Sequence, residues 1–376
     1  MDILIVTGEA SGDEHGAKVV NQIKAENPDI NFFGMGGENL RSSGVEIIVD
    51  SKIVAGVMGF TEVFSKLFSL LKARKKLINE IKTRKPKLAI LIDFPDFNFS
   101  LFKTLKAQNV KVVYYAAPQV WAWRKGRVKT IKKYVDKVLS IIPFEKEFYQ
   151  KAGVDVTYVG HPILEHQNRV SDKQTLMKNL DLNPQKRLLA VLPGSRKAEI
   201  DLLLEDMLAA VKIVKSKYKD IQVAIPVASS LDYDSFKFKV PSDIKLLKGN
   251  ATELLNCADA AIIASGTVSL DASLARVPFL VLYRLKPLTY FIARKFVTGV
   301  KHFSLPNLIS GKEIVKEFLQ DEVEPKIIAS EIIKFLEDAT YSRNLISNLD
   351  LVNSQLSIGE STSNKVAKEV LLAANS

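Results

Sequence analysis

The chain has 376 residues, of which 47% are hydrophobic and 25% are charged, which excludes a disordered protein. This length exceeds what one ordinary hydrophobic core supports, so two domains are expected. The formal net charge of +11 indicates an anionic partner, either nucleic acid or an anionic membrane surface. The single cysteine, Cys257, excludes an internal disulfide. Its apolar neighbours predict a buried thiol, which fits a reducing, cytoplasmic compartment.

The first half alternates short apolar runs with helical patterns. Runs typical of buried strands cover residues 2–7, 31–34, 88–92, 110–116 and 137–142. Helices are expected over about 11–25, after a glycine-rich turn, and over about 60–82. This alternation predicts parallel strands joined by right-handed crossovers.

The second half repeats the same alternation. A long amphipathic helix is expected over about 198–215, and strands over 188–192, 222–227, 244–247, 260–264 and 279–283. A polar stretch at about 165–172 marks the boundary between the halves. The predicted fold class is therefore α/β, with two doubly wound, Rossmann-like domains facing across a cleft. They cover 1–165 and 166–350, and a helical tail covers 351–376.

One segment of the first half combines positive charge with a helical apolar stripe. The residues that define it are Phe64, Phe68, Leu71, Lys72, Lys75 and Lys76. A basic amphipathic helix of this kind is typical of an interfacial membrane element, and a core helix with a solvated lysine face is the alternative. No RNA-binding signature or zinc-finger spacing occurs, so nucleic acid is not an expected partner. Because Asp2 follows Met1 directly and no apolar run reaches ~20 residues, neither a signal peptide nor a transmembrane helix is expected.

Two acidic turns in the first half are candidates for catalysis. Glu9 lies in the glycine-rich turn after the first strand, where a carboxylate disfavours phosphate and suits a sugar hydroxyl. Asp93 follows the strand at 88–92, and its neighbours Phe94 and Phe97 favour the raised pKa of a general base. Asp96 is a weaker candidate, because it also suits a helix cap.

Two loops in the second half resemble phosphate sites, since each places glycine and hydroxyl groups where a helix begins. The first comprises Gly194, Ser195 and Arg196, and the second Ser265, Gly266 and Thr267. Asp271, one helical turn later, could reach ribose hydroxyls. For Arg196 the alternative is a surface side chain paired with Glu199 or Asp201. For Asp271 the alternative is a solvent-facing helix residue.

Other polar and aromatic motifs carry less weight. Trp121 and Trp123, beside Arg124, suit a sugar face, an acyl chain or a phosphate, and ordinary packing explains the tryptophans equally well. His161 has no second ligand at a metal-binding spacing. Asp232 and Asp234 superficially match a metal-binding motif, but their loop favours a turn. No metal and no cofactor are expected.

Taken together, these motifs closely resemble the lipid-A-disaccharide synthase family. The matching stretches are Gly8–Asp13, Asp93–Asn98, Pro118–Arg124, Pro143–Glu145, Gly160–Pro162, Leu192–Arg196, Ser265–Thr267, Tyr283–Arg284 and Ser304–Asn307. The resemblance implies a GT-B fold and a peripheral enzyme on the cytoplasmic face of the inner membrane of Gram-negative bacteria. It gives Glu9, Asp93 and Asp96 importance on the acceptor side. Arg196 and Asn307 carry over to the UDP side. Two departures stand out: Asp271 replaces a usual glutamate, and Glu14 and His15 replace a commonly apolar pair.

The activity that the resemblance implies is transfer of 2,3-diacylglucosamine from its UDP derivative to 2,3-diacylglucosamine 1-phosphate. In the expected inverting, metal-independent mechanism, Asp93 is the general base and Arg196 stabilises the departing diphosphate. The first domain would then serve the acceptor and the membrane, and the second the UDP-sugar. A second copy of the chain is a further candidate partner. A UDP-sugar 2-epimerase and a non-catalytic, membrane-associated nucleotide-binding module are the two alternative functions.

Overall fold

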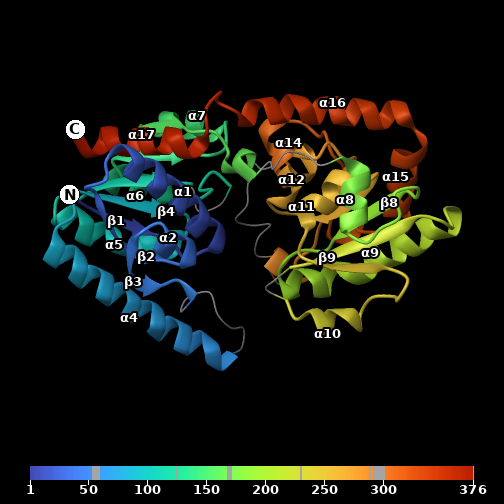
Figure 1. Ribbon diagram of the computed structural model, residues 1–376, viewed down its shortest axis with the longest axis horizontal. Coiled ribbons are helices and arrows are strands. Elements are labelled where there is room, and N and C mark those ends of the chain that lie inside the picture. Colours follow the sequence, from blue (N-terminus) through green and yellow to red (C-terminus); the bar gives the residue numbers. More distant parts are fainter. Residues whose placement is uncertain are drawn as a thin grey trace. The chain divides into compact units, whose positions relative to one another are not determined.

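The computed structural model describes residues 1–52, 60–122, 126–166, 172–228, 231–287, 289–291 and 301–375, excluding the side chains of 60–67 and 235. The chain divides into two compact units. Unit 1 comprises Met1–His166 together with Leu356–Ser376, and unit 2 comprises Gln167–Gln355. The elements of both units are labelled in Figure 1.

Unit 1 is built on a seven-stranded parallel sheet with the order β3-β2-β1-β4-β5-β6-β7. The strands are β1 (Asp2–Val6), β2 (Asn31–Gly36), β3 (Val45–Asp50), β4 (Leu88–Ile92), β5 (Lys111–Tyr115), β6 (Lys137–Ser140) and β7 (Val156–Tyr158). Every residue of β4 is buried, because helices cover both faces of the sheet. The edge strands β3 and β7 were absent from the sequence prediction, since one is partly exposed and the other has three residues.

The helices of unit 1 form two layers. They are α1 (Ala10–Glu26), α2 (Glu38–Ser42), α4 (Phe60–Arg84), α5 (Pro95–Ala107), α6 (Arg127–Tyr134), α7 (Glu145–Lys151), the 3₁₀ helix η1 (Pro162–His166) and α17 (Thr362–Asn375). The cores of α4 and α5 lie on one face of the sheet, and those of α1 and α17 lie on the other. The C-terminal helix α17 runs beside α1 (Figure 1), with Val366 and Val370 fully buried. The end of the tail therefore belongs to unit 1.

Unit 2 is built on a six-stranded parallel sheet with the order β10-β9-β8-β11-β12-β13. The strands are β8 (Leu188–Leu192), β9 (Gln222–Val227), β10 (Lys245–Lys248), β11 (Ala260–Ala264), β12 (Phe279–Tyr283) and β13 (Glu317–Leu319). The helices are α8 (Lys173–Asn179), α9 (Lys197–Lys217), α10 (Tyr233–Lys237), α11 (Ala251–Cys257), α12 (Val268–Leu274), α14 (Leu305–Ser310), α15 (Pro325–Glu337) and α16 (Ala339–Leu356), with the 3₁₀ helix η2 at Gln320–Glu322. The predicted α/β class, with two doubly wound Rossmann-like domains, is confirmed.

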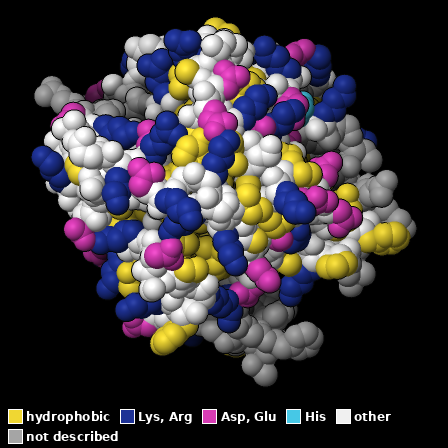
Figure 2. Space-filling model, turned by 90° about the vertical axis from the view of Figure 1, so that its right-hand side faces the viewer, with side chains coloured by type: hydrophobic (Ala, Val, Ile, Leu, Met, Phe, Trp, Pro, Cys, Tyr) yellow, Lys and Arg dark blue, Asp and Glu magenta, His cyan; other side chains and the backbone are white. Residues whose placement is uncertain are grey.

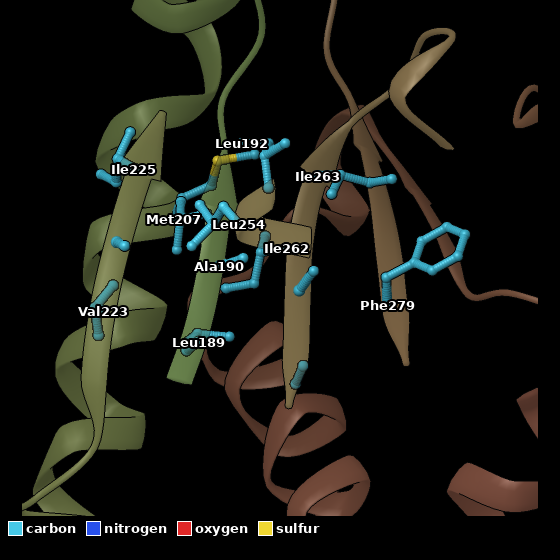
Figure 3. Close-up of a cluster of buried hydrophobic side chains, with 14 of the residues drawn as sticks. Leu189, Ala190, Leu192, Met207, Val223, Ile225, Leu254, Ile262, Ile263 and Phe279 are labelled. Atoms are coloured by element: carbon cyan, nitrogen blue, oxygen red, sulfur yellow. The ribbon is translucent and has the colours of Figure 1, made fainter. Parts of the chain in front are cut away.

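The core of unit 2 joins the sheet to its helices. Figure 3 shows Met207 of α9 and Leu254 of α11 near Ala190 and Leu192 of β8. The thiol of Cys257 is buried as predicted, and burial raises its pKa to about 11. The tail that the sequence predicted to be helical comprises the end of α16 and the whole of α17, and Gly359 between them has a φ of +79°.

The surface of the molecule mixes charges of both signs. On the face shown in Figure 2, Lys and Arg side chains lie singly among acidic and hydrophobic side chains, so the positive charge is dispersed there. Among the residues that the structure describes, no helix combines the length and hydrophobicity required to cross a membrane.

Candidate active site

The two acidic turns of unit 1 follow β1 and β4, the adjacent strands at which the strand order reverses. β1 pairs in parallel with β4, and strands are added outward from this pair on both sides. Glu9 follows β1, and Asp93 follows β4 directly. In doubly wound sheets, ligands bind beyond the carboxyl ends of the strands at this switch point. The topology therefore places both carboxylates where such a fold builds a site.

Asp93 combines partial burial with an unusual backbone. Asp93 and Phe94 have φ angles of 45° and 48°, which place two consecutive non-glycine residues in the left-handed region. Such residues cost on the order of 1–3 kcal/mol each and persist only where the surrounding structure holds them. Burial raises the pKa of the Asp93 carboxyl, and the charge of Glu9 raises it further, against the opposing hydrogen bond from the Phe94 N–H. The structure thus brings Glu9 and Asp93 into electrostatic contact.

The ring of Phe94 connects the two turns. A Cβ atom added to Gly8 would lie 2.6 Å from this ring. That separation is too short for two carbon atoms, so the Phe94 ring occupies the space that only a glycine leaves open. The turn that carries Glu9 and the turn that carries Asp93 are therefore in direct contact.

Asp96 has a different environment from Asp93. It lies in the first turn of α5, and its exposed side chain forms an ion pair with Arg127 of α6. The ion pair orients the Asp96 carboxylate toward α6. Arg127 was missed by the sequence analysis, because 31 residues separate it from Asp96 and no local pattern connects the two.

Trp121, in the loop after β5, covers the carboxylate of Glu145 at the start of α7. The Trp121 indole N–H donates to Glu145 Oε1 at 2.9 Å, and the Trp121 ring lies edge-on to Phe144. Glu145 is only 1% exposed, and burial raises its pKa from 4.5 to about 8. Trp121 thus has the ordinary packing role that the sequence left open. Trp123 and Arg124 lie outside the described residues.

In unit 2 the first loop that the sequence predicts to bind phosphate follows β8 at the corresponding switch point. Gly194 has a φ of +114°, a conformation that favours glycine. Arg196 precedes the first turn of α9, its side chain is 73% exposed, and it forms an ion pair with Glu199 at 3.0 Å. An exposed ion pair of this kind contributes little stability, so an anionic ligand can replace Glu199 as the partner of Arg196. Ser195 is exposed beside it.

The second phosphate loop follows β11, the strand that pairs with β8. Gly266 and Thr267 are exposed, and a Cβ added to Gly266 would meet nothing within 4 Å. The Ser265 N–H donates to Leu282 O at 2.9 Å, and its hydroxyl donates to Phe303 O at 3.3 Å. Burial raises the pKa of Asp271 to about 6. The open space at Gly266 therefore lies directly before the first turn of α12.

Asn307 is fully buried, and its side-chain amide is occupied by backbone groups of the segment after α14. Its Nδ2 donates to Val315 O at 2.8 Å, and its Oδ1 accepts from the N–H groups of Ile314 and Val315 at 2.6 and 3.0 Å. It therefore holds the segment after α14 in place. Glu317, which the sequence analysis missed, accepts the N–H groups of Phe303 and Ser304 and so fixes the other end of α14.

The basic amphipathic segment is the described part of α4. Phe68 and Leu71 are 72% and 54% exposed, and Lys72, Lys75 and Lys76 are exposed with them. Ala73, Leu77 and Ile81 on the same helix are buried against the sheet. One face of α4 thus belongs to the core, while the other presents large apolar side chains among lysines. The side chain of Phe64 lies outside the described residues.

The weaker metal candidates have structural partners. His161 is buried, and its Nδ1 accepts the Ile163 N–H at 3.2 Å. Asp232 caps α10 by accepting the Asp234 N–H at 3.1 Å. Within the described ranges, no three His, Cys, Asp or Glu side chains gather as metal ligands would.

Two solved structures with a similar fold are an epimerase and a glycosyltransferase. The chain is similar to a UDP-GlcNAc 2-epimerase from Neisseria meningitidis bound to UDP-GlcNAc, with a TM-score of 0.67 and 13% identity, covering 99% of this chain and 100% of that one. It is also similar to the calicheamicin glycosyltransferase CalG4, with a TM-score of 0.61 and 13% identity, covering 100% and 98%. These likenesses define the class of fold, namely two Rossmann-like domains of the GT-B kind.

Sequence relatives define the family. The model of the lipid-A-disaccharide synthetase family matches residues 3–370. The lipid-A-disaccharide synthase of Myxococcus xanthus is 43% identical over 88% of this chain and 86% of its own. That of Geobacter sulfurreducens is 38% identical over 98% of this chain and 96% of its own. The chain belongs to the lipid-A-disaccharide synthase family, and it is therefore a glycosyltransferase of lipid A biosynthesis.

Proposed function

We propose that this enzyme transfers 2,3-diacylglucosamine from its UDP derivative to 2,3-diacylglucosamine 1-phosphate, with inversion at the anomeric carbon. The products are the β-1,6-linked disaccharide 1-phosphate and UDP. The observation that carries the proposal is Asp93. This half-buried carboxylate has a raised pKa and a left-handed backbone, and it follows the switch-point strand β4. Family membership supplies the reaction class in which such a base is required.

In the proposed step, Asp93 takes the proton from the 6-hydroxyl of the acceptor. The oxygen of that hydroxyl forms a bond to C1 of the donor sugar while the bond between C1 and the UDP oxygen breaks. A base works best when its pKa lies near the working pH, and burial moves Asp93 in that direction. Glu9, exposed beside it, suits a hydrogen bond to an acceptor hydroxyl and keeps the pKa of Asp93 high.

The leaving diphosphate is assigned to the loops of unit 2. Negative charge grows on UDP as the bond breaks, so preformed donors at this point accelerate the reaction. Arg196 and the N-terminus of the long helix α9 supply a full and a partial positive charge. Gly194, Ser195, Ser265, Gly266 and Thr267 line the two loops. The seven-residue helix α12 adds a weaker dipole.

Three further residues, Asp271, Asn307 and Asp96, have supporting roles in the proposed reaction. Asp271 suits a hydrogen bond to the ribose, and the reaction as proposed needs neither metal nor cofactor. The amide of Asn307 is already used by the backbone, so we assign it a positioning role beside the second loop. Asp96, exposed and paired with Arg127, serves to order the start of α5.

Both acylated substrates place the enzyme at a membrane, and we assign the contact to the exposed face of α4. Phe68 and Leu71 would enter the interface while Lys72, Lys75 and Lys76 face anionic headgroups. The proposed location is the cytoplasmic face of the inner membrane. Flotation with anionic vesicles tests this assignment. The double variant Phe68→Asp/Leu71→Asp should lose binding, while Leu351→Asp, at a leucine that is 60% exposed on α16, should keep it.

A transfer assay with both acylated substrates, in the presence of EDTA, tests the reaction. Disaccharide and UDP are the expected products, and Asp93→Asn should lower kcat by at least a hundredfold while UDP binding persists. Asp96→Asn is the matched carboxylate control and should retain most of the activity. Near-normal turnover of Asp93→Asn would refute the assignment of the base.

The epimerase fold likeness keeps UDP-sugar 2-epimerisation as a second candidate. The same assay separates the candidates, because an epimerase would release an isomerised donor and no disaccharide. A non-catalytic nucleotide-binding module would return the donor unchanged. The exposed apolar face of α4 favours the transferase, since an epimerase of soluble sugar nucleotides has no need of it.

A further inference from the structure

The main-chain carbonyl of Asp93 is held by two buried side chains from different elements. Asn98 Nδ2, one turn into α5, donates to Asp93 O at 2.6 Å. The Tyr114 hydroxyl, on β5, donates to the same oxygen at 2.9 Å. Both residues are 0% exposed. The Asp93 N–H in turn donates to Tyr115 O at 3.2 Å, so the backbone N–H and the backbone carbonyl of Asp93 are both held by hydrogen bonds.

Asn98 and Tyr114 donate to the backbone at the point where its conformation is left-handed. Asp93 and Phe94 are the two consecutive residues with positive φ, and residues in that region persist only where their surroundings hold them. A carboxylate on a relaxed, extended backbone would leave the end of β4 in another direction. The hydrogen bonds to the carbonyl therefore bear on where the Asp93 side chain lies.

The packing of the two donors fixes them independently of any ligand. The Tyr114 ring packs edge-on against Phe99 and Phe102, with ring centroids 6.4 and 6.3 Å apart. Asn98 donates its backbone N–H to Phe94 O at 3.1 Å, which ties it to the second left-handed residue.

We propose that Asn98 and Tyr114 are positioning residues, which hold the backbone of Asp93 in its left-handed conformation and so aim its carboxylate at the acceptor hydroxyl. This inference rests on the proposed function, in which Asp93 is the base. Neither side chain touches substrate; each acts through the Asp93 carbonyl.

The groups that set the pKa of Asp93 give the proposal a specific signature. Burial makes the largest contribution and raises the pKa of Asp93. The charge of Glu9 raises this pKa further, and the hydrogen bond from the Phe94 N–H lowers it. Tyr114 is itself buried, which raises its pKa well above 10, so its hydroxyl remains a donor throughout the working range. If the carbonyl is released, the carboxyl becomes more hydrated, and its pKa falls toward the ordinary value. The acidic limb of the kcat profile should then move to lower pH.

Tyr114→Phe is the mildest test, because it removes one hydroxyl and leaves the ring. Its kcat should fall about tenfold, since misplacing a reacting group by ~1 Å costs on the order of a hundredfold. The acidic limb should shift down, and the Kd for UDP should stay within about twofold. Asn98→Leu, similar in size, should do the same. Tyr115→Phe is the matched control, because this buried tyrosine of the same strand packs on the opposite face of the sheet, and its kcat and pH profile should not change.

The outcomes are distinguishable. A lower kcat with an unmoved acidic limb in Tyr114→Phe, or an unchanged kcat, would overturn the positioning role even if Asp93→Asn is inactive. Full activity of Asp93→Asn would instead remove the base assignment on which the proposal rests. If Asn98→Leu fails to fold, Tyr114→Phe decides the question alone.

Discussion

Glu145 should make unit 1 less stable as the pH rises through neutrality. Its carboxyl is 1% exposed, and burial raises its pKa from 4.5 to about 8, although the Trp121 N–H and the Ile142 backbone oppose the shift. The folded state therefore keeps a proton that the unfolded state has released. Stability should fall as pH rises from about 4.5 to about 8, and should level off outside that window.

The size of the effect follows from the shift. Each pH unit inside the window costs ~1.4 kcal/mol, so the penalty is roughly 3 kcal/mol at pH 7 and on the order of 5 kcal/mol above pH 8. Glu145→Gln keeps an oxygen that can accept the Trp121 N–H, and its side chain is neutral at every pH. Between pH 6 and pH 8, the variant should gain roughly 2–3 kcal/mol relative to the native chain.

Urea unfolding from pH 5.5 to 9, followed by tryptophan fluorescence, measures this difference. The chain has two tryptophans, Trp121 and Trp123, and both lie in unit 1, so the signal reports that unit. Glu147→Gln is the matched control, since Glu147 is exposed on the same helix and pairs with Lys151. Its pH dependence should follow the native chain. Parallel stability curves for the native chain and Glu145→Gln would show that the buried carboxyl does not carry the proton.

Three further predictions follow from close contacts and buried carboxylates. Gly8→Ala should lower kcat more than UDP affinity, because the added Cβ would meet the Phe94 ring at 2.6 Å; steady-state kinetics and calorimetry measure both. Asp13→Ala should cost roughly 1–3 kcal/mol in urea unfolding, since the carboxylate accepts three backbone N–H groups at the start of α2. Burial raises the pKa of Asp271 to about 6, so UDP affinity should weaken more steeply between pH 7.5 and pH 5.5 in the native chain than in Asp271→Asn, where only the UDP phosphate titrates, as calorimetry at both pH values would show.

Local sequence patterns predicted most of the fold. The strands β1, β4, β8 and β11 are uninterrupted apolar runs that need burial on both faces, and a run of this kind is visible without any partner. The loops that follow them were predicted for the same reason. In doubly wound folds the ends of such strands carry the functional residues, so Glu9, Asp93 and Arg196 could be selected from their positions alone.

Short or partly exposed elements could not be predicted in this way. The three-residue strands β7 and β13 have no period long enough to recognise, and they form because a neighbouring strand offers its edge. The position of α17 was open for a similar reason. Its apolar face fits many surfaces, and only the contact with α1 and β5 selects one.

By itself, the sequence determined two doubly wound domains, the acidic and glycine-containing turns that follow their strands, and the basic apolar stripe of α4. These follow from the order and spacing of residues near one another in the chain. The tertiary structure decided the left-handed backbone of Asp93, the burial of Glu145 and the occupied amide of Asn307. Each depends on groups that the fold brings together, and a pKa or a strained backbone reflects that whole environment and not the residue alone.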